Sequence, residues 1–185
     1  IIGMTTIKAP SDFLYDIELS YDKAKLLEEM NNVDFTPFND EGPQGKGQSK
    51  IPLNSWFYNP PTWLQGHVID EYPEVSRVQS QICDLLECKD IRPRYYKQEK
   101  DTEVPMHPDR GTLCAINIIL SDNYGPMVFG ELGSVRYSCA ILNLEKRHAV
   151  PAFPEERVLL KFSIFDVLYK DALSNYRINI SKEKK

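Results

Sequence analysis

The sequence predicts a mainly β protein with N-terminal helices, and two patterns support this prediction. After Asp90, short apolar or alternating runs follow one another, separated by turn residues such as those at 122–126. Five or more short strands in roughly eighty residues favour an antiparallel sandwich or barrel over alternating β-α units. The expected strands cover residues 91–97, 113–120, 127–129, 134–144 and 157–169.

The first half of the chain carries helical periodicity instead. Ser20 is a suitable N-cap for a first helix, whose apolar stripe is Leu26, Leu27 and Met30. Pro73 suits the first turn of a second helix, because proline lacks the amide that a first turn leaves unpaired. The apolar residues of that helix recur at helical spacing, at Val75, Val78, Ile82, Leu85 and Leu86.

Two segments between these helices have the composition of loops. Residues 40–49 contain three glycines and no large apolar residue, which is typical of a surface loop. Residues 56–63 are rich in aromatic residues and proline, and we expect them to pack between the helices and the strands. A lid over a site is the alternative for both segments.

Length and composition indicate one domain over residues 1–185, with 42% hydrophobic and 26% charged residues. Residues 1–90 are expected to form a helical and loop support, and residues 91–170 the β core. The net charge of −5 and the absence of a long basic run argue against a nucleic-acid partner. No apolar run reaches the roughly 20 residues of a membrane span, so no membrane partner is expected.

The four cysteines, at positions 83, 88, 114 and 139, form neither a C-x-x-C motif nor a zinc-type cluster. The first residues, 1–19, mix charged side chains among apolar ones and do not resemble an export signal. We therefore expect buried thiols and a cytoplasmic location.

The histidines suggest a metal site. There are three, His67, His107 and His148, and His107 forms an H-x-D pair with Asp109 at the end of a predicted strand. Side chains alternate along a strand, so positions 107 and 109 share a face. An antiparallel barrel can return His148 beside them. Two imidazoles and one carboxylate on one face of an octahedral ion are typical of non-haem Fe(II) oxygenases.

Arg157 strengthens this interpretation. It follows His148 by nine positions and opens an apolar strand, where its guanidinium can bind a carboxylate through two hydrogen bonds. Each residue alone has a plainer interpretation: a surface histidine, an aspartate at a turn, or a solvated arginine at a strand end. Together, the two histidines, the aspartate and the arginine favour a metal site with a carboxylate ligand beside it.

The pattern His107-x-Asp109, His148 and Arg157 resembles the Fe(II)/2-oxoglutarate-dependent dioxygenase superfamily, and within it the prolyl-hydroxylase-like branch. The similarity covers residues 92–165, with its strongest stretches at 106–120 and 142–157. It implies a double-stranded β-helix, a cupin-like jelly roll, with helices packed on one sheet. The interval between Asp109 and His148 is short for the superfamily, and Pro108 stands in the middle of the motif.

The resemblance also implies roles for individual residues. His107, Asp109 and His148 would be the iron ligands, and Arg157 would bind the distal carboxylate of 2-oxoglutarate. Asn117 would contact the same co-substrate, unless its amide bonds to neighbouring backbone. Tyr96 would offer a phenol to it, with Tyr95 as the rival candidate.

The implied activity is hydroxylation of a peptidyl side chain of prolyl type or of a small molecule, using dioxygen and 2-oxoglutarate and releasing succinate and CO2. A cupin-like metal-binding protein without 2-oxoglutarate turnover is the alternative. Such sites usually use three or four histidines, and here only His67 is spare. A jelly-roll binding module without catalysis would leave Arg157 unexplained. The sequence does not predict the substrate or the oligomeric state.

Overall fold

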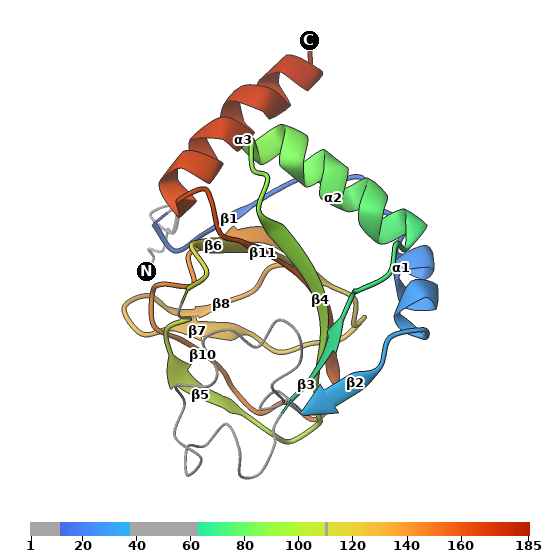
Figure 1. Cartoon of the computed structure of the whole chain (residues 1–185). Helices are drawn as coiled ribbons and strands as arrows, with labels where there is room; N and C mark the ends of the chain where they lie inside the picture. Colours follow the sequence, from blue (N-terminus) through green and yellow to red (C-terminus); the bar gives the residue numbers. More distant parts are fainter. Residues whose placement is uncertain (1–11, 38–62, 110) are drawn as a thin grey trace.

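Two antiparallel sheets face each other in the computed structural model, and three helices cover the outer side of one of them (Figure 1). The structure describes residues 12–37, 63–109 and 111–185. In spatial order, the larger sheet contains β1 (Leu14–Asp16), β9 (Cys139–Leu142), β6 (Cys114–Ile119), β11 (Arg157–Ile164), β4 (Ile91–Gln98), β3 (Trp63–His67) and β2 (Phe35–Pro37). The smaller sheet contains β5 (Val104–His107), β10 (His148–Val150), β7 (Met127–Phe129) and β8 (Gly133–Val135).

The strands from β4 to β11 form the double-stranded β-helix that the resemblance implied. Within the larger sheet β4, β11, β6 and β9 are neighbours, while β5, β10, β7 and β8 make up the smaller sheet. The chain therefore passes repeatedly from one sheet to the other and encloses a space between them. Every pairing is antiparallel, as the run of short strands predicted.

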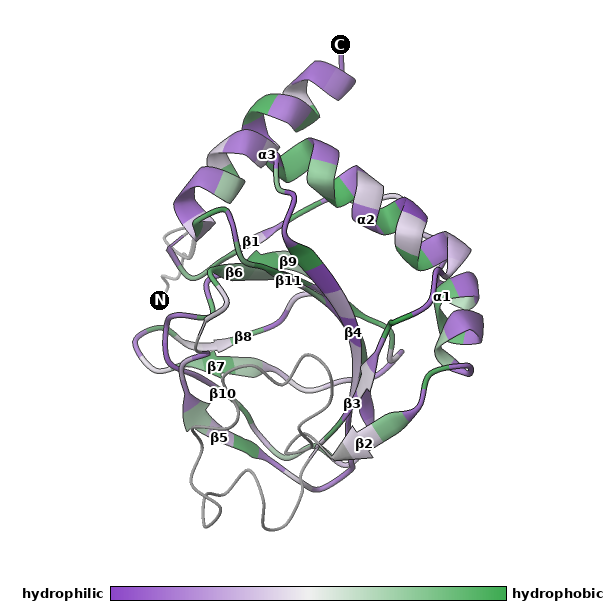
Figure 2. Cartoon of the chain, viewed as in Figure 1, coloured by the Kyte–Doolittle hydropathy of each residue, from purple (hydrophilic) through white to green (hydrophobic). Residues whose placement is uncertain are grey.

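Each face of the larger sheet has its own core. The outer face packs against α1 (Lys23–Met30), α2 (Pro73–Leu86) and α3 (Tyr169–Glu183), and the inner face packs against the smaller sheet. Alternation along β4 sends Tyr95 to the outer core and Tyr96 to the inner one. Strand β9 is buried on both faces and is hydrophobic along its length (Figure 2). Among the helices in the described part of the chain, none has the length and hydrophobicity needed to cross a membrane.

The sequence predicted helices in the N-terminal half alone, but a third helix, α3, follows the last strand. The run 157–169 was predicted as one strand, but β11 ends at Ile164 and α3 begins at Tyr169. The buried residues of α3 do recur at helical spacing, at Tyr169, Ala172, Leu173 and Tyr176. Two asparagines of α3, Asn175 and Asn179, donate hydrogen bonds to the Leu86 and Leu85 carbonyls at the end of α2. These contacts dock α3 on α2.

The first half of the chain also supplies strands, since β1, β2 and β3 all join the larger sheet. The predicted run 134–144 divides into β8 and β9.

Helix α1 is capped by Asp22, whose side chain accepts from the Lys25 amide, and not by Ser20. All four cysteines are free thiols, and three are buried as expected, while Cys83 is partly buried. The loop 40–49 and residues 56–62 lie outside the described residues.

A carboxylate from α1 caps α2. The N-cap residue of α2, Tyr72, makes no capping hydrogen bond with its side chain. Glu29 instead accepts from the amides of Glu74 and Val75, at 2.8 and 3.0 Å. Glu74 in turn accepts from the Asp22 amide at 2.6 Å and from Arg77 at 2.8 and 2.9 Å. Helices α1 and α2 are therefore fixed to each other by charged hydrogen bonds.

Replacing Glu29 is expected to destabilise the fold. Glu29→Ala leaves two amides of α2 without their acceptor, and we expect a loss of about 1–2 kcal/mol in the free energy of unfolding. Glu29→Gln keeps an acceptor oxygen and should lose less. Urea denaturation measures both variants, and equal stability of Glu29→Ala and the wild type would contradict this account of the cap.

A second prediction concerns acid. Hydrogen bonds from Arg77 outweigh burial and hold the pKa of Glu74 at about 2, below its ordinary 4.5. The stabilisation from this carboxylate is therefore complete above pH 4.5 and is lost as the pH falls towards 2. The Glu74→Gln variant should be less stable than the wild type at about pH 6, and the difference should shrink at about pH 3. A constant difference in urea denaturation at the two pH values would refute this.

Candidate metal centre

Strand pairing brings two histidines together. His107 ends β5, His148 begins β10, and the two residues are direct partners in the smaller sheet. Their ring centroids are 4.5 Å apart. The Nδ1 atoms of His107 and His148 each lie 2.7 Å from a backbone carbonyl oxygen, of Pro105 and Lys146 respectively. A carbonyl only accepts, so each Nδ1 carries the proton, and in the neutral imidazole Nε2 keeps its lone pair.

Asp109 completes a group of three ligand atoms. Its Oδ1 lies 3.4 Å from Nε2 of His107 and 3.2 Å from Nε2 of His148. Its amide donates to the Leu144 carbonyl at 2.8 Å, which fixes the turn after β5. With both imidazoles neutral, the three atoms that face one another are all acceptors, and a cation between them would satisfy all three. Ligands about 2.1 Å from an octahedral metal lie about 3 Å apart, so the three atoms fit a divalent metal.

Lys161 forms an ion pair with the other carboxylate oxygen of Asp109. The sequence analysis did not identify this lysine. Its Nζ lies 2.8 Å from Oδ2. Burial alone would raise the pKa of Asp109, but the positive charge of Lys161 and hydrogen bonds to the carboxylate oppose burial, so that pKa lies well below its usual range. The carboxylate is therefore ionised, and Oδ1 remains free for a metal. A sequence signal existed: Lys161 interrupts the apolar run of β11 at a position that shares a face with Arg157.

Arg157 is buried and points into the barrel. Only 5% of it is exposed, so the interpretation as a solvated strand-end charge was wrong. Its Nη2 donates to the Tyr137 hydroxyl at 3.0 Å, and its Nε has no hydrogen-bond partner. Among the described residues, no carboxylate forms an ion pair with Arg157. A buried cation is costly without a counter-charge, so this side chain fits an anionic ligand.

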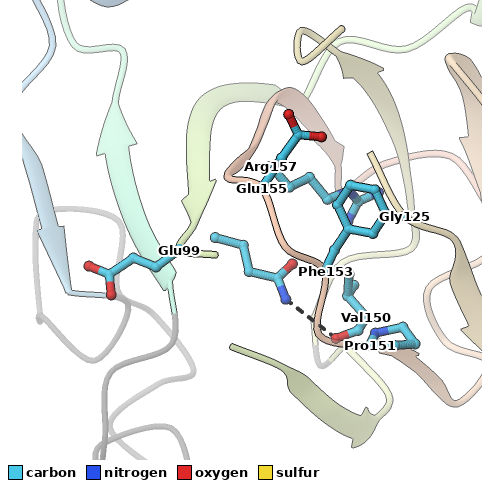
Figure 3. Close-up of a pocket in the computed structure, with 8 residues that line it drawn as sticks. Glu99, Gly125, Val150, Pro151, Phe153, Glu155 and Arg157 are labelled. Atoms are coloured by element: carbon cyan, nitrogen blue, oxygen red, sulfur yellow. Dashed lines mark hydrogen bonds between the residues drawn. The ribbon is translucent and has the colours of Figure 1, made fainter. Parts of the chain in front are cut away.

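The surroundings of Arg157 at the start of β11 are shown in Figure 3. Phe153 packs against Gly125, where a Cβ would come within 2.9 Å of the phenyl ring. Gln98, the direct partner of Arg157 on β4, donates to the Val150 carbonyl at 3.4 Å. The absence of a side chain at Gly125 therefore lets the loop that carries Phe153 pack close to the start of β11.

Tyr137 links Arg157 to Asn117 and was also missed in the sequence. Its hydroxyl accepts from Asn117 Nδ2 at 2.9 Å as well as from Arg157. Asn117 therefore bonds to a side chain and not to neighbouring backbone, and its Oδ1 has no partner. Tyr137 follows β8, in a segment with no motif that marks it.

The structure also separates the two tyrosines. Tyr96 lies in the inner core beside Trp63, with 5.2 Å between the ring centroids. Tyr95 faces the helices, and its hydroxyl donates to the Leu26 carbonyl at 2.8 Å. Tyr96 is therefore the tyrosine that faces the site.

All six residues that the sequence singled out line one pocket of about 390 Å³ that opens to solvent: Tyr96, His107, Asp109, Asn117, His148 and Arg157. Lys161, Trp63 and five apolar side chains complete its wall: Val104, Met127, Leu144, Val150 and Leu159. Arg157 and Lys161 are four residues apart on β11, or about 13 Å at 3.3 Å per residue. A ligand that reaches both the metal and Arg157 must therefore carry two groups separated by several atoms.

No protein-family model and no curated protein sequence matches the chain. The structure is similar to that of HygX from Streptomyces hygroscopicus with nickel and 2-oxoglutarate bound. The TM-score is 0.53 with 11% identity, over 89% of this chain and 87% of that one. HygX with nickel, 2-oxoglutarate and hygromycin B gives 0.51 and 10%, over the same shares of the two chains. At this identity the likeness establishes the fold alone.

Removing the Tyr137 hydroxyl should destabilise the protein. The Tyr137→Phe variant leaves two buried donors, on Asn117 and Arg157, without their acceptor, at a cost of about 1–3 kcal/mol. Tyr124→Phe is the matched control, because that hydroxyl takes no part in this network. Chemical denaturation compares the two variants, and losses of the same size would argue against the network.

Proposed function

We propose that the chain is an Fe(II)- and 2-oxoglutarate-dependent oxygenase of the prolyl-hydroxylase-like branch. Its reaction would be hydroxylation of a C–H bond in a peptidyl side chain or a small molecule. The observation that carries the proposal is a two-histidine, one-carboxylate group in the same pocket as a buried arginine without a carboxylate partner. The two histidines and the carboxylate are a ligand set typical of non-haem iron. The buried arginine suits the far carboxylate of a dicarboxylate.

The chain's own residues would have distinct tasks. His107, Asp109 and His148 would hold the iron through Nε2, Oδ1 and Nε2, because their other polar atoms are already bonded. When bound, iron and 2-oxoglutarate use dioxygen so that one oxygen atom enters the C–H bond and the other leaves in succinate, with release of CO2. These three residues would all bind the iron from one side, which would leave room on its other side for co-substrate and dioxygen.

Arg157 would orient the co-substrate. Its free Nε donor can bind the distal carboxylate while Nη2 stays on Tyr137. Rotation of the Asn117 amide would let the Tyr137 hydroxyl donate to Oδ1 and would turn the NH2 group towards the same carboxylate. Tyr96 and Trp63 would exclude water from one side of the pocket.

The likeness to HygX is consistent with this proposal, since that protein was crystallised with nickel and 2-oxoglutarate. Its complex with hygromycin B gives an example of a small-molecule ligand on this fold. A cupin-like metal protein without 2-oxoglutarate would explain the histidines. It would leave Arg157 buried without an anion, and for that reason we favour the oxygenase.

Anaerobic titration with Fe(II) and then 2-oxoglutarate tests the proposal. A weak visible charge-transfer band should form only after both additions and should be absent in His107→Ala. In Arg157→Gln we expect the concentration of 2-oxoglutarate needed for half of the band to rise by about 100-fold, since a buried charge pair is lost. Arg147→Gln, at an exposed position, is the control and should behave as the wild type. No band in iron-loaded protein would refute the oxygenase.

A further inference from the structure

Lys161 lies beside the candidate metal centre, and its amino group has hydrogen-bond donors to spare. Its side chain is 13% exposed and lines the same pocket as Asp109 and Arg157. An ammonium group has three N–H donors. Among the residues that the structure describes, these donors find one acceptor, Oδ2 of Asp109, at 2.8 Å. The nearby ring of Tyr96 has its centroid 5.7 Å from Nζ. The other donors are therefore left for a ligand in the pocket.

The place of Lys161 along β11 matches the metal-side end of a ligand that reaches Arg157. Side chains alternate along a strand, so Arg157, Leu159 and Lys161 share one face, and all three line the pocket. Arg157 stands at the start of this row. Lys161 stands about 13 Å further along the strand, in contact with Asp109. A dicarboxylate that lies along the row with one end on Arg157 therefore has its other end directed towards Lys161.

The charge of Lys161 would also favour an anion at that end. Its ion pair with Asp109 offsets the negative charge of the carboxylate. With a divalent metal at the proposed site, the metal would then keep its double charge for an incoming carboxylate. Without the ammonium, the charge of Asp109 would repel that carboxylate at short range.

We propose that Lys161 is a second cationic residue of the co-substrate site. Its ammonium donates hydrogen bonds to the carboxylate beside the keto group of 2-oxoglutarate, while Arg157 binds the distal carboxylate. Lysine suits this task because its rotatable donors can contact Asp109 and the ligand at the same time. This role rests on the proposed function, because it requires a 2-oxo acid whose keto end lies at the metal.

Calorimetry of pyruvate and 2-oxoglutarate binding to the nickel-loaded protein tests the proposal. Pyruvate keeps the 2-oxo acid end of 2-oxoglutarate and lacks the distal carboxylate, so it reports on the Lys161 end alone. In Lys161→Gln we expect both acids to bind about 10-fold more weakly, because hydrogen bonds from a charged donor are lost. Lys161→Arg keeps the charge and should recover part of this affinity. Arg157→Gln should weaken 2-oxoglutarate by about 100-fold and leave pyruvate unchanged.

Lys100→Gln, at an exposed position, is the matched control and should bind both acids as the wild type does. The nickel content of each variant is measured, because Lys161 also contacts the candidate metal ligand Asp109. A Lys161→Gln variant that holds nickel and binds pyruvate with wild-type affinity overturns the proposal. Loss of nickel from this variant also overturns it, by assigning Lys161 to the support of Asp109. If the wild type binds neither acid, the proposed function itself fails.

Discussion

The antiparallel pairing of β5 with β10 is the constraint on which the candidate site depends. It places His107 directly opposite His148, although the two residues are far apart in the chain. The turn after β5, held by the Asp109 amide on Leu144, then points the carboxylate at both imidazoles. Because each Nδ1 is bonded to its own strand end, both rings present Nε2 before any metal arrives. Such second-sphere bonds fix the geometry and the protonation state of a metal ligand.

The interior of the barrel holds a charge balance that is incomplete without ligands. Lys161 and Arg157 project from β11 into the pocket, and Asp109 is the carboxylate among the residues that line it. Asp109 is paired with Lys161, and Arg157 donates a hydrogen bond to the neutral hydroxyl of Tyr137, which does not offset its charge. A divalent metal at the proposed site would add further positive charge. Binding of a dicarboxylate would therefore be favoured electrostatically at both of its ends.

The helices stabilise this arrangement from outside without entering the site. They pack on the outer face of the strands whose inner face carries Tyr96, Asn117 and Lys161. Glu29 joins α1 to α2, and two asparagines of α3 bond to the end of α2. A strand held on both faces is a rigid support, which is what precise placement of ligands requires.

Local patterns in the sequence determined much of the β core and of the site. Alternation predicted that His107 and Asp109 share a face, and helical spacing predicted α2. The sequence did not show that Tyr96 and not Tyr95 faces inward, because alternation assigns opposite faces but does not say which face is inner. Lys161 and Tyr137 were missed because their partners, Asp109 and Arg157, come from distant segments. Only tertiary pairing decided these contacts, since strand register acts between residues that the sequence separates.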